Sequence, residues 1–433
     1  MRKLTVKNFS VIQDAELEFG KITVLIGPQS SGKSLLCKLA NFLRQDVLEL
    51  ATGAILTRTP LEVLKGQVAH SFINRFLHGM SIDKQSECEF NEGDYSIKIT
   101  SRAMNGPGTH NVVDCEFTAP FESLYKSFTD NPFEDGVRSA SRKQEQDEIW
   151  TKLNLLLNNL FVYESLYIPD GRSFFVNPQK GFTAVQNTSL DPVILRFAPE
   201  IVWNMNWRVG RMVARDSALE ELQKEMARIG QGEVVVKGDE PLFRRKQDRA
   251  LLPLSLLSSG TSEILPIFNV LFRGACLQEE REAARSATRI PPCNPPIAAS
   301  KQLVYVEEPE ANIFPLTQND MVRLFVWLAN RESWNFDWVI TTHSPYILSS
   351  FNNLIYAGQL GQNPELRSQI KIDPKYWVEP GTFRAYSIHD GKLESILSDT
   401  GLINGEYLDG VSDAIGSEFD SLLRLEYDHP KAS

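Results

Sequence analysis

Residues 27–34 read Gly27-Pro28-Gln29-Ser30-Ser31-Gly32-Lys33-Ser34, which matches the phosphate-loop pattern G-x-x-x-x-G-K-[ST] at every fixed position. The run before it, Lys21–Ile26, is apolar and β-branched, as buried strands are, and apolar residues after it recur at helical spacing as far as Leu43. A glycine-bounded loop between a strand and a helix turns backbone N–H groups toward an anion, and the helix N-terminus adds partial positive charge. The stretch therefore predicts an α/β fold that binds nucleotide phosphates.

The chemistry expected of this phosphate loop divides among its residues. The Lys33 side chain is long enough to reach the β- and γ-phosphates, and the Ser34 hydroxyl is an oxygen ligand suited to Mg²⁺. We count Lys33 among the catalytic groups and Ser34 among the metal ligands. The residues expected to contact the nucleotide are Gly27, Pro28, Gln29, Ser30, Ser31, Gly32, Lys33, Ser34 and Leu35.

The composition is that of an ordinary globular protein. At 433 residues, 42% of them hydrophobic, the chain can form two or three domains, or one large α/β domain with insertions. Its net charge of −10 argues against a surface given over wholly to nucleic acid, although a local basic face remains open. The five cysteines lack the paired spacing of a zinc site or a disulfide framework. No apolar run approaches about 18 residues, so we expect a soluble cytoplasmic protein without a membrane partner.

Local patterns predict the remaining organisation. Strands are expected at 4–9, 15–19, 22–26, 86–90, 95–101, 111–118, 303–306 and 338–342, with a return to strand over 230–238 and a last pair about 389–392. Helices are expected over 60–80, most of 192–229, and 406–426, and a loop over 129–147. We divide the chain into a first half of the core (1–165), a helical lobe (166–250), a second half of the core (251–350) and a C-terminal extension (351–433).

Two carboxylates follow the expected strand at 303–306. A carboxylate at the C-terminal end of a strand beside a phosphate loop can ligate Mg²⁺, and we give Glu307 this role. The next one, Glu308, can polarise the attacking water as a general base. The alternative is a solvated acidic turn, which a phosphate loop in the same chain makes less favourable.

His343 follows the strand expected at 338–342. Ligands of parallel sheets bind at the C-terminal edge, where an imidazole can donate to a γ-phosphate and report its presence. We predict this catalytic role in preference to an incidental histidine.

A second anion site is predicted at residues 258–260. Ser258, Ser259 and Gly260 precede an expected helix from Ile264 to Phe272, and hydroxyls at a helix N-terminus can bind an anion. One nucleotide does not need two such helix starts from the same chain, whereas a head-to-tail pair of chains does. An ordinary helix N-cap is the open alternative.

In this order the four stretches resemble the ABC-type ATPase core, specifically its SMC- and OLD-like branch. Gly27–Ser34 is similar to its Walker A motif, Leu257–Thr261 to its signature loop, Leu303–Glu308 to Walker B with the catalytic glutamate, and His343 to its switch histidine. The resemblance implies a P-loop NTPase fold: a mixed sheet flanked by helices, with N-terminal antiparallel strands and an inserted helical lobe.

The same resemblance implies ATP and Mg²⁺ as cofactors. ATP would be sandwiched between subunits of a homo-oligomer, a head-to-tail dimer or higher, with residues 258–260 acting in trans and hydrolysis releasing the partners. The match has departures: Glu307 replaces the commoner aspartate, and Asn312 and Phe314 stand where related chains often carry histidines. No glutamine can be placed as the family's Q-loop ligand. Arg172 lies in a run resembling I-P-x-x-R, where a contact to phosphate or nucleic acid and a structural ion pair are both open.

The surrounding segments narrow the class of ATPase. The interval between Ser34 and Ser258 lacks the long heptad pattern of an SMC rod, and the residues after His343 lack the carboxylate pattern of a TOPRIM nuclease. The chain thus resembles the stand-alone ATPase subunits of bacterial antiphage defence systems such as PARIS, Septu and some retrons. This implies a sensor or scaffold with a separate effector, such as a nuclease or toxin, in trans.

Two rival classes stay open. A RecF-like repair or recombination ATPase would bind DNA as an ATP-dependent dimer, and the basic run Phe243–Arg249 could meet nucleic-acid phosphates or be a solvated loop. The nucleotide-binding subunit of a membrane transporter is disfavoured by the run Glu307-Glu308-Pro309-Glu310. The helix expected at 406–426 is a candidate docking element for an effector or a domain-closing helix.

Overall fold

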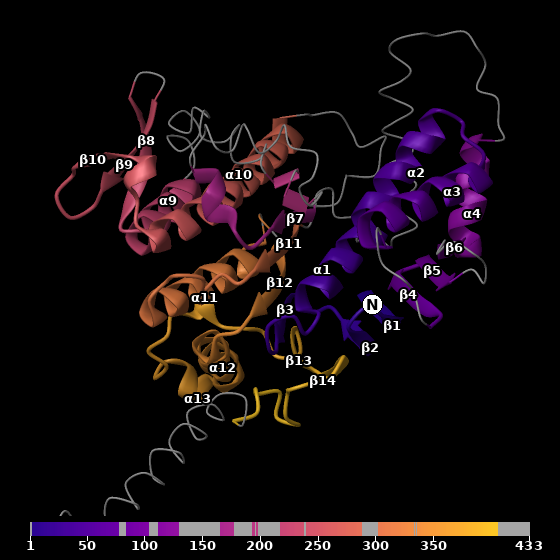
Figure 1. Ribbon diagram of the computed structural model, residues 1–433. Helices are drawn as coiled ribbons and strands as arrows, with labels where there is room; N and C mark the ends of the chain where they lie inside the picture. The colour runs from indigo at the N-terminus through magenta and orange to yellow at the C-terminus, as the bar shows by residue number, and fades with distance from the viewer. Residues whose placement is uncertain are drawn as a thin grey trace, which may run out of the picture.

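One large mixed sheet organises the part of the chain that the computed structural model describes: residues 2–77, 84–103, 111–129, 165–176, 193–194, 196–197, 217–237, 240–287, 302–332, 334 and 336–405. The strand order is β6-β5-β4-β1-β2-β14-β13-β3-β12-β11-β7, with helices against it (Figure 1). The predicted α/β class, a mixed sheet flanked by helices, is confirmed. The loop expected at 129–147, except its first residue, and the helix expected at 406–426 lie outside the described residues, as do most of the helical stretch expected over 192–229 and the end of the helix expected over 60–80.

The strands expected from the sequence lie close to their predicted bounds, whereas several helices and short strands were not expected. The strands are β1 (Arg2–Phe9), β2 (Ile12–Glu18), β3 (Ile22–Ile26), β4 (Ser86–Glu92), β5 (Tyr95–Ala103), β6 (Asn111–Phe117), β7 (Ser165–Ile168), β8 (Gly232–Lys237), β9 (Glu240–Arg245), β10 (Leu251–Pro253), β11 (Gln302–Glu307), β12 (Phe336–Thr342), β13 (Phe383–His389) and β14 (Lys392–Ser395). The α-helices are α1 (Lys33–Asn41), α2 (Val47–Leu56), α3 (Leu61–Phe72), α4 (Ala119–Thr129), α9 (Ser217–Ile229), α10 (Ser259–Ala287), α11 (Pro315–Asn330), α12 (Pro345–Leu360) and α13 (Pro364–Arg367).

The parallel half of the sheet brings three predicted motifs to one edge. Strands β13, β3, β12, β11 and β7 run parallel to one another. In this register Ile26 lies beside Thr342, and Thr341 lies beside Glu307. The loop after β3, the residue after β12 and the carboxylates after β11 therefore lie together, at the edge where parallel sheets bind ligands.

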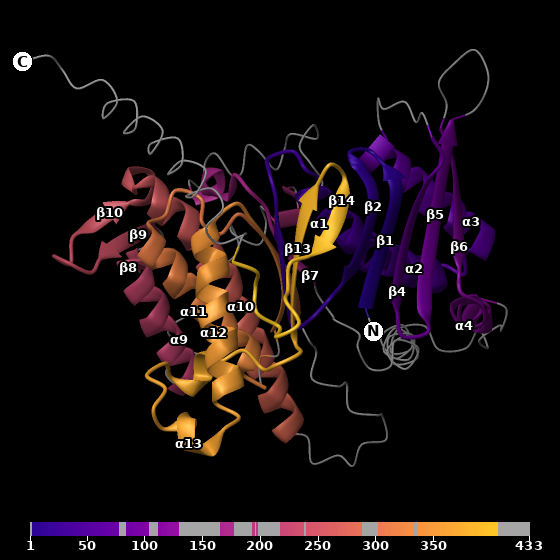
Figure 2. The same cartoon turned by 90° about the horizontal axis from the view of Figure 1, so that it is seen from below.

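Both faces of the parallel half are buried, which explains its almost continuous apolar strands. In β3, Ile22 and Val24 pack with α9, α10, α11 and α12, whereas Leu25 packs on the opposite face with α1, α2 and α3. Figure 2 shows the first group of helices gathered away from the antiparallel strands. The α1 helix, which begins at the phosphate loop, is thereby fixed against the sheet on its apolar side.

The antiparallel half is built from β1, β2, β4, β5 and β6, in agreement with the N-terminal antiparallel strands that the resemblance implied. Three strands from other predicted segments also join the large sheet. β7, from the segment predicted as a helical lobe, pairs with β11. β13 and β14, from the predicted C-terminal extension, pair with β3 and β2. β8 and β9 of the lobe segment form a three-stranded sheet with β10, which opens the next predicted segment, and this sheet lies beside α9 (Figure 1).

Candidate nucleotide-binding site

The phosphate loop has the backbone that its glycines allow. It joins β3 to α1, whose first residue is Lys33. Gly32 has φ +107°, a conformation that side-chain-bearing residues rarely adopt, and a Cβ there would approach Ile12 Cγ1 to 3.0 Å. A Cβ on Gly27 would lie 2.6 Å from the carbonyl oxygen of Ile388 in β13. Both fixed glycines of the motif are therefore required by the local structure.

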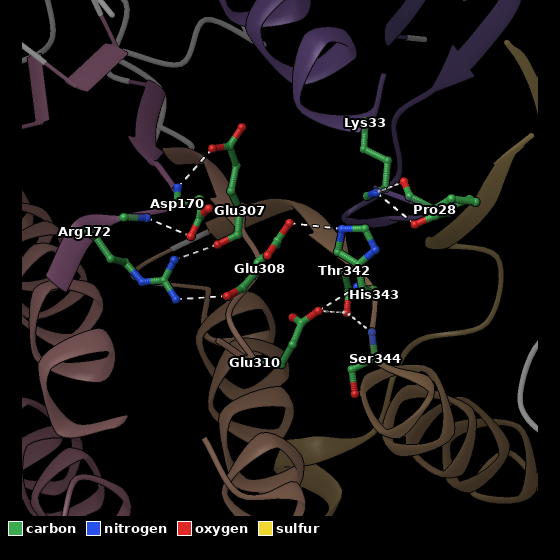
Figure 3. A network of polar contacts seen from close by, with 12 residues as sticks. Pro28, Lys33, Asp170, Arg172, Glu307, Glu308, Glu310, Thr342, His343 and Ser344 are labelled. Carbon is green, nitrogen blue, oxygen red and sulfur yellow. Dashed lines mark hydrogen bonds and ion pairs between the residues drawn. The ribbon is translucent and has the colours of Figure 1, made fainter. Parts of the chain in front are cut away.

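Lys33 closes the loop across its own backbone. Its Nζ donates to the carbonyl oxygens of Gly27 and Pro28 at 2.9 and 2.8 Å (Figure 3). The side chain is buried, and this burial lowers the pKa of the ammonium, with Glu308 and Glu310 opposing the shift. The positive charge is thus held at the mouth of the loop, where a phosphate oxygen can replace either carbonyl as acceptor.

Glu307 is held firmly at the end of β11. Its Oε1 accepts from the Tyr167 hydroxyl at 2.7 Å, and its Oε2 accepts from the Asp170 N–H at 3.0 Å. The Tyr167 hydroxyl also lies 3.5 Å from the Ser34 carbonyl oxygen, so one phenol contacts both residues that were predicted to hold the metal. Sequence analysis missed Tyr167, although it lies in the apolar run before Arg172.

The donor set around Ser34 and Glu307 fits Mg²⁺. Among the described residues no group of three or more His, Cys, Asp or Glu side chains is arranged to hold a metal ion. Mg²⁺ does not require one, because it is commonly bound through one or two protein oxygens together with water and substrate phosphates. Each Glu307 oxygen keeps a lone pair beyond its single bond, and Ser34 supplies a hydroxyl at the start of α1.

Glu308 faces His343 across the strand ends. The His343 Nε2 and the Glu308 Oε1 are 3.0 Å apart, and both side chains are about one-third exposed or less (Figure 3). Burial raises the pKa of the Glu308 carboxyl, while His343 opposes the shift. Glu308 also has φ +42°, which is uncommon for a side-chain-bearing residue and typical of functional turns. The structure therefore brings together two of the predicted catalytic groups.

Arg172 is a structural side chain, which decides between its two interpretations. It is fully buried, and it donates to the carbonyl oxygens of Glu307 and Glu308 at 2.7 and 2.9 Å. Its Nε donates to the Glu263 carbonyl oxygen and lies 3.4 Å from the Glu263 carboxylate. Because these acceptors occupy the N–H groups of the guanidinium, Arg172 supports the loop after β11 and is not exposed to an external phosphate.

The residues predicted as a second anion site lie at the start of α10. Ser258 and Ser259 are exposed, and the Ser258 Oγ accepts from the Thr261 N–H at 3.3 Å, as an N-cap does. A Cβ on Gly260 would lie 2.7 Å from the Asn312 carbonyl oxygen, so this helix start packs against the loop after β11. Within the described residues no hydrogen bond joins 258–260 to the phosphate loop. Their contact with a nucleotide held by a second copy of the chain stays a prediction.

The basic run at 243–249 is largely paired. Arg244 contacts Glu233, and Arg245 contacts Asp248, both at 2.5 Å. Lys246 and Arg249 are exposed and, with the two paired arginines, line a cleft of about 670 Å³ between α9 and the three-stranded sheet. The run is therefore neither a free patch nor a simple loop, but one wall of a surface cleft.

Comparisons with known proteins were made on sequence and on structure. No protein-family model and no curated protein matches the chain. Among solved structures, an SMC head bound to the C-terminal winged-helix domain of ScpA is similar at 10% identity and a TM-score of 0.41, over 91% of this chain and 96% of that one. The chain has the fold of a P-loop NTPase.

Two further structures are similar at the same level. The SMC head domain of Thermotoga maritima has 11% identity and a TM-score of 0.35, over 92% of this chain and 98% of that one. The recombination mediator protein RecF, in a structure described as RecF-ATPrS, has 11% identity and a TM-score of 0.31, over 91% and 97%. With identities of 10–11% and TM-scores of 0.31–0.41, these likenesses carry no argument about this chain. Within the described residues, no helix is both long and apolar enough to cross a membrane.

Proposed function

We propose that this protein binds and hydrolyses ATP with Mg²⁺ and self-associates around the nucleotide. The observation that carries the proposal is the 3.0 Å contact between Glu308 and His343, at the sheet edge that also bears the phosphate loop. A carboxylate with a raised pKa beside an imidazole is a suitable general base for water. A nucleotide held by Gly27–Leu35 would present its γ-phosphate to this pair.

The hydrolytic step follows from these groups. Water attacks the γ-phosphorus, the bond to the bridging oxygen of ADP breaks, and the water proton passes to Glu308. Lys33 stabilises charge on the phosphate oxygens, and His343 donates to the γ-phosphate. Ser34 and Glu307 would hold Mg²⁺, which would neutralise further negative charge on the phosphates.

Exposed apolar residues support self-association beside this site. Phe314 and Leu316 are 69% and 71% exposed where α11 begins, and Leu256 is 68% exposed just before the Ser258 helix start. The Gly260–Asn312 contact places these two segments against each other. Clustered exposed apolar side chains commonly mark protein–protein contacts. A second copy, contributing Ser258, Ser259 and Gly260, would cover them and complete the nucleotide site.

Glu308→Gln tests the proposal. The wild type should hydrolyse ATP in the presence of Mg²⁺, whereas Glu308→Gln should bind ATP without turnover and accumulate as an ATP-dependent dimer or larger species in sedimentation. Glu379→Gln, an exposed carboxylate in the loop before β13, is the matched control and should behave as wild type. Wild-type turnover by Glu308→Gln would contradict the assignment of the base.

We propose further that the ATPase is the sensor or scaffold of a bacterial defence system with a separate effector. The support is the order of the four motifs, from Gly27–Ser34 to His343, which resembles that of the ATPase subunits of such systems. A gene for a small nuclease or toxin beside this one should be required, together with Glu308, for protection of cells against phage. Protection that persists with Glu308→Gln, or a housekeeping replication locus at that place, would argue against it.

A second candidate function is that of a RecF-like ATPase that binds DNA. The specific observation in its favour is the cleft lined by Arg244, Arg245, Lys246 and Arg249, because basic clefts attract phosphate backbones. DNA-stimulated, salt-sensitive hydrolysis would favour this function over the defence role.

A further inference from the structure

Glu310 is a third carboxylate of the loop after β11, and neither the metal nor the water uses it. Its Oε1 accepts two hydrogen bonds, from the Thr342 hydroxyl at 2.7 Å and from the His343 N–H at 2.6 Å (Figure 3). Both donors lie at the end of β12, the strand next to β11. One carboxylate oxygen therefore ties the loop after β11 to the residue that carries the imidazole.

His343 is consequently held at both ends by the same short loop. Glu310 holds its backbone N–H, and Glu308 contacts its Nε2 at 3.0 Å. Pro309 separates the two glutamates and restricts the backbone between them, because its ring fixes φ. The contacts form a closed ring, so the imidazole cannot shift relative to Glu308 without breaking one of them.

The ring rests on a buried support. The Thr342 hydroxyl that donates to Glu310 also accepts from the Ser344 N–H at 2.9 Å. The Ser344 hydroxyl donates to Gln318 in α11 at 2.6 Å and caps α12 by accepting from the Tyr346 N–H. Thr342 is fully buried and Ser344 nearly so. This network fixes Thr342, and through it the orientation of the Glu310 carboxylate.

The surroundings of the second Glu310 oxygen make it possible to test whether Glu310 acts through its hydrogen bonds or through its charge. Its Oε2 is buried without a hydrogen-bond partner among the described residues. A glutamine here would keep the oxygen that accepts both hydrogen bonds and would replace one unpaired atom with another. An alanine would leave the Thr342 and His343 donors without their acceptor, which is costly in a buried position.

We propose that Glu310 is a positioning residue, which sets the His343 imidazole against Glu308 by holding the end of β12. The inference rests on the proposed ATP hydrolysis, since it deepens the same site. It predicts that Glu310 affects the rate of the chemical step through His343, while nucleotide binding by the phosphate loop is left intact. Misplacement of a catalytic group by about 1 Å can cost up to about a hundredfold in rate.

The test compares steady-state ATP hydrolysis and binding of a fluorescent ATP analogue across variants of the full chain. Glu310→Ala should lower kcat by about tenfold to a hundredfold, with KM and analogue affinity changed by no more than about threefold. Glu310→Gln should retain kcat within about threefold of wild type. Loss of analogue binding in Glu310→Ala, or equal damage from Gln and Ala, would overturn the proposal.

Thr342→Val, with Thr341→Val as its control, provides a second and independent test if Glu310→Ala does not fold. Thr342→Val removes one donor to Glu310 and should lower kcat, whereas Thr341→Val is the matched control, because the Thr341 hydroxyl is buried without a hydrogen-bond partner. Equal kcat in the two valine variants would count against the proposal.

A double-mutant cycle separates positioning from general stabilisation. If Glu310 acts through His343, then adding Glu310→Ala to His343→Ala should change kcat by less than about twofold. Multiplicative losses would overturn the proposal. A wild type that fails to hydrolyse ATP would refute the proposed function and this inference with it, whereas an active wild type with an equally active Glu310→Ala would refute this inference alone.

Discussion

The Arg172 guanidinium and the Glu263 carboxylate lie 3.4 Å apart in the protein interior. Glu263 belongs to the start of α10, whereas the carbonyl oxygens that Arg172 also holds belong to Glu307 and Glu308. A single buried side chain therefore connects the helix start that carries Ser258–Gly260 with the backbone of the proposed catalytic loop. Movement of α10 on self-association would be transmitted to Glu308 along this connection.

Replacing Arg172 with methionine should destabilise the protein strongly. The substitution keeps an apolar stem of similar length, but it leaves the Glu263 carboxylate without its cation and the Glu307 and Glu308 carbonyl oxygens without their donor. Breaking a buried ion pair from one side typically costs about 3–5 kcal/mol. Thermal or denaturant unfolding measures this loss.

Arg245→Met is the matched control for the Arg172 prediction. Arg245 also pairs with a carboxylate, that of Asp248, but both side chains are nearly half exposed. Exposed ion pairs contribute little, because water already solvates both charges. Equal losses in the free energy of unfolding for the two substitutions would show that the buried contacts of Arg172 stabilise the protein no more than an exposed ion pair does.

Tyr167→Phe should weaken the response to Mg²⁺. It removes the hydroxyl that donates to Glu307 Oε1 at 2.7 Å and leaves the ring stacked on Tyr305. Residues that orient a metal ligand typically contribute about tenfold or more to metal affinity. The Mg²⁺ concentration for half-maximal ATP hydrolysis should therefore rise by about tenfold.

Tyr305→Phe controls for the loss of a phenol at the same stack. The Tyr305 hydroxyl is buried without a hydrogen-bond partner, so its removal should leave the Mg²⁺ response unchanged. If both tyrosine variants respond to Mg²⁺ as the wild type does, then Tyr167 does not orient a metal ligand.

Sequence patterns predicted the features that depend on neighbouring residues. The strand before Gly27, the helix after Gly32 and the antiparallel strands near the N-terminus all follow from local periodicity, and the structure confirms them. The shared edge of β3, β11 and β12 was anticipated because each carries a polar motif at its C-terminal end. Local patterns thus located Glu308 and His343, and the structure shows them in contact.

Features that depend on distant pairing could not be obtained in this way. Nothing local in Ser165–Ile168 indicates that it pairs with β11, and nothing in Phe383–His389 indicates that it pairs with β3. The functions of Arg172 and Tyr167 depend on the pairing of β7 with β11, because β7 carries Tyr167 and leads into the turn before Arg172. Glu310 lay within the quoted motif, but its partner Thr342 was visible only after β12 was placed beside β11.

Phe314→Asp should weaken self-association without weakening nucleotide binding by a single chain. Phe314 is 69% exposed beside the loop after β11, and a charge there would have to be desolvated in the proposed interface. Hydrolysis per chain should fall at low protein concentration and recover as the concentration rises. Sedimentation of Glu308→Gln with ATP, with and without Phe314→Asp, measures the shift directly.

Tyr356→Asp is the control for that interface. Tyr356 is another exposed aromatic residue, 50% exposed, but it lies in the second half of α12. It is ten residues, or about 15 Å along the helix axis, from Tyr346 at the start of α12. Its substitution should leave the concentration dependence unchanged. A Phe314→Asp variant that assembles as the wild type does would place the interface elsewhere.

Removing Lys246 and Arg249 together should reduce the salt dependence of DNA binding, if DNA occupies the cleft beside α9. Each cation that contacts a phosphate contributes about one unit to the slope of log affinity against log salt concentration. The double alanine variant should therefore lose up to about two units of slope, measured by fluorescence anisotropy with a short duplex and ATP. Lys126→Ala with Lys371→Ala removes two exposed cations from other elements and should leave the slope unchanged. A wild type without measurable duplex binding would exclude the DNA-binding candidate, and an unchanged slope in the cleft variant would place any DNA on another surface.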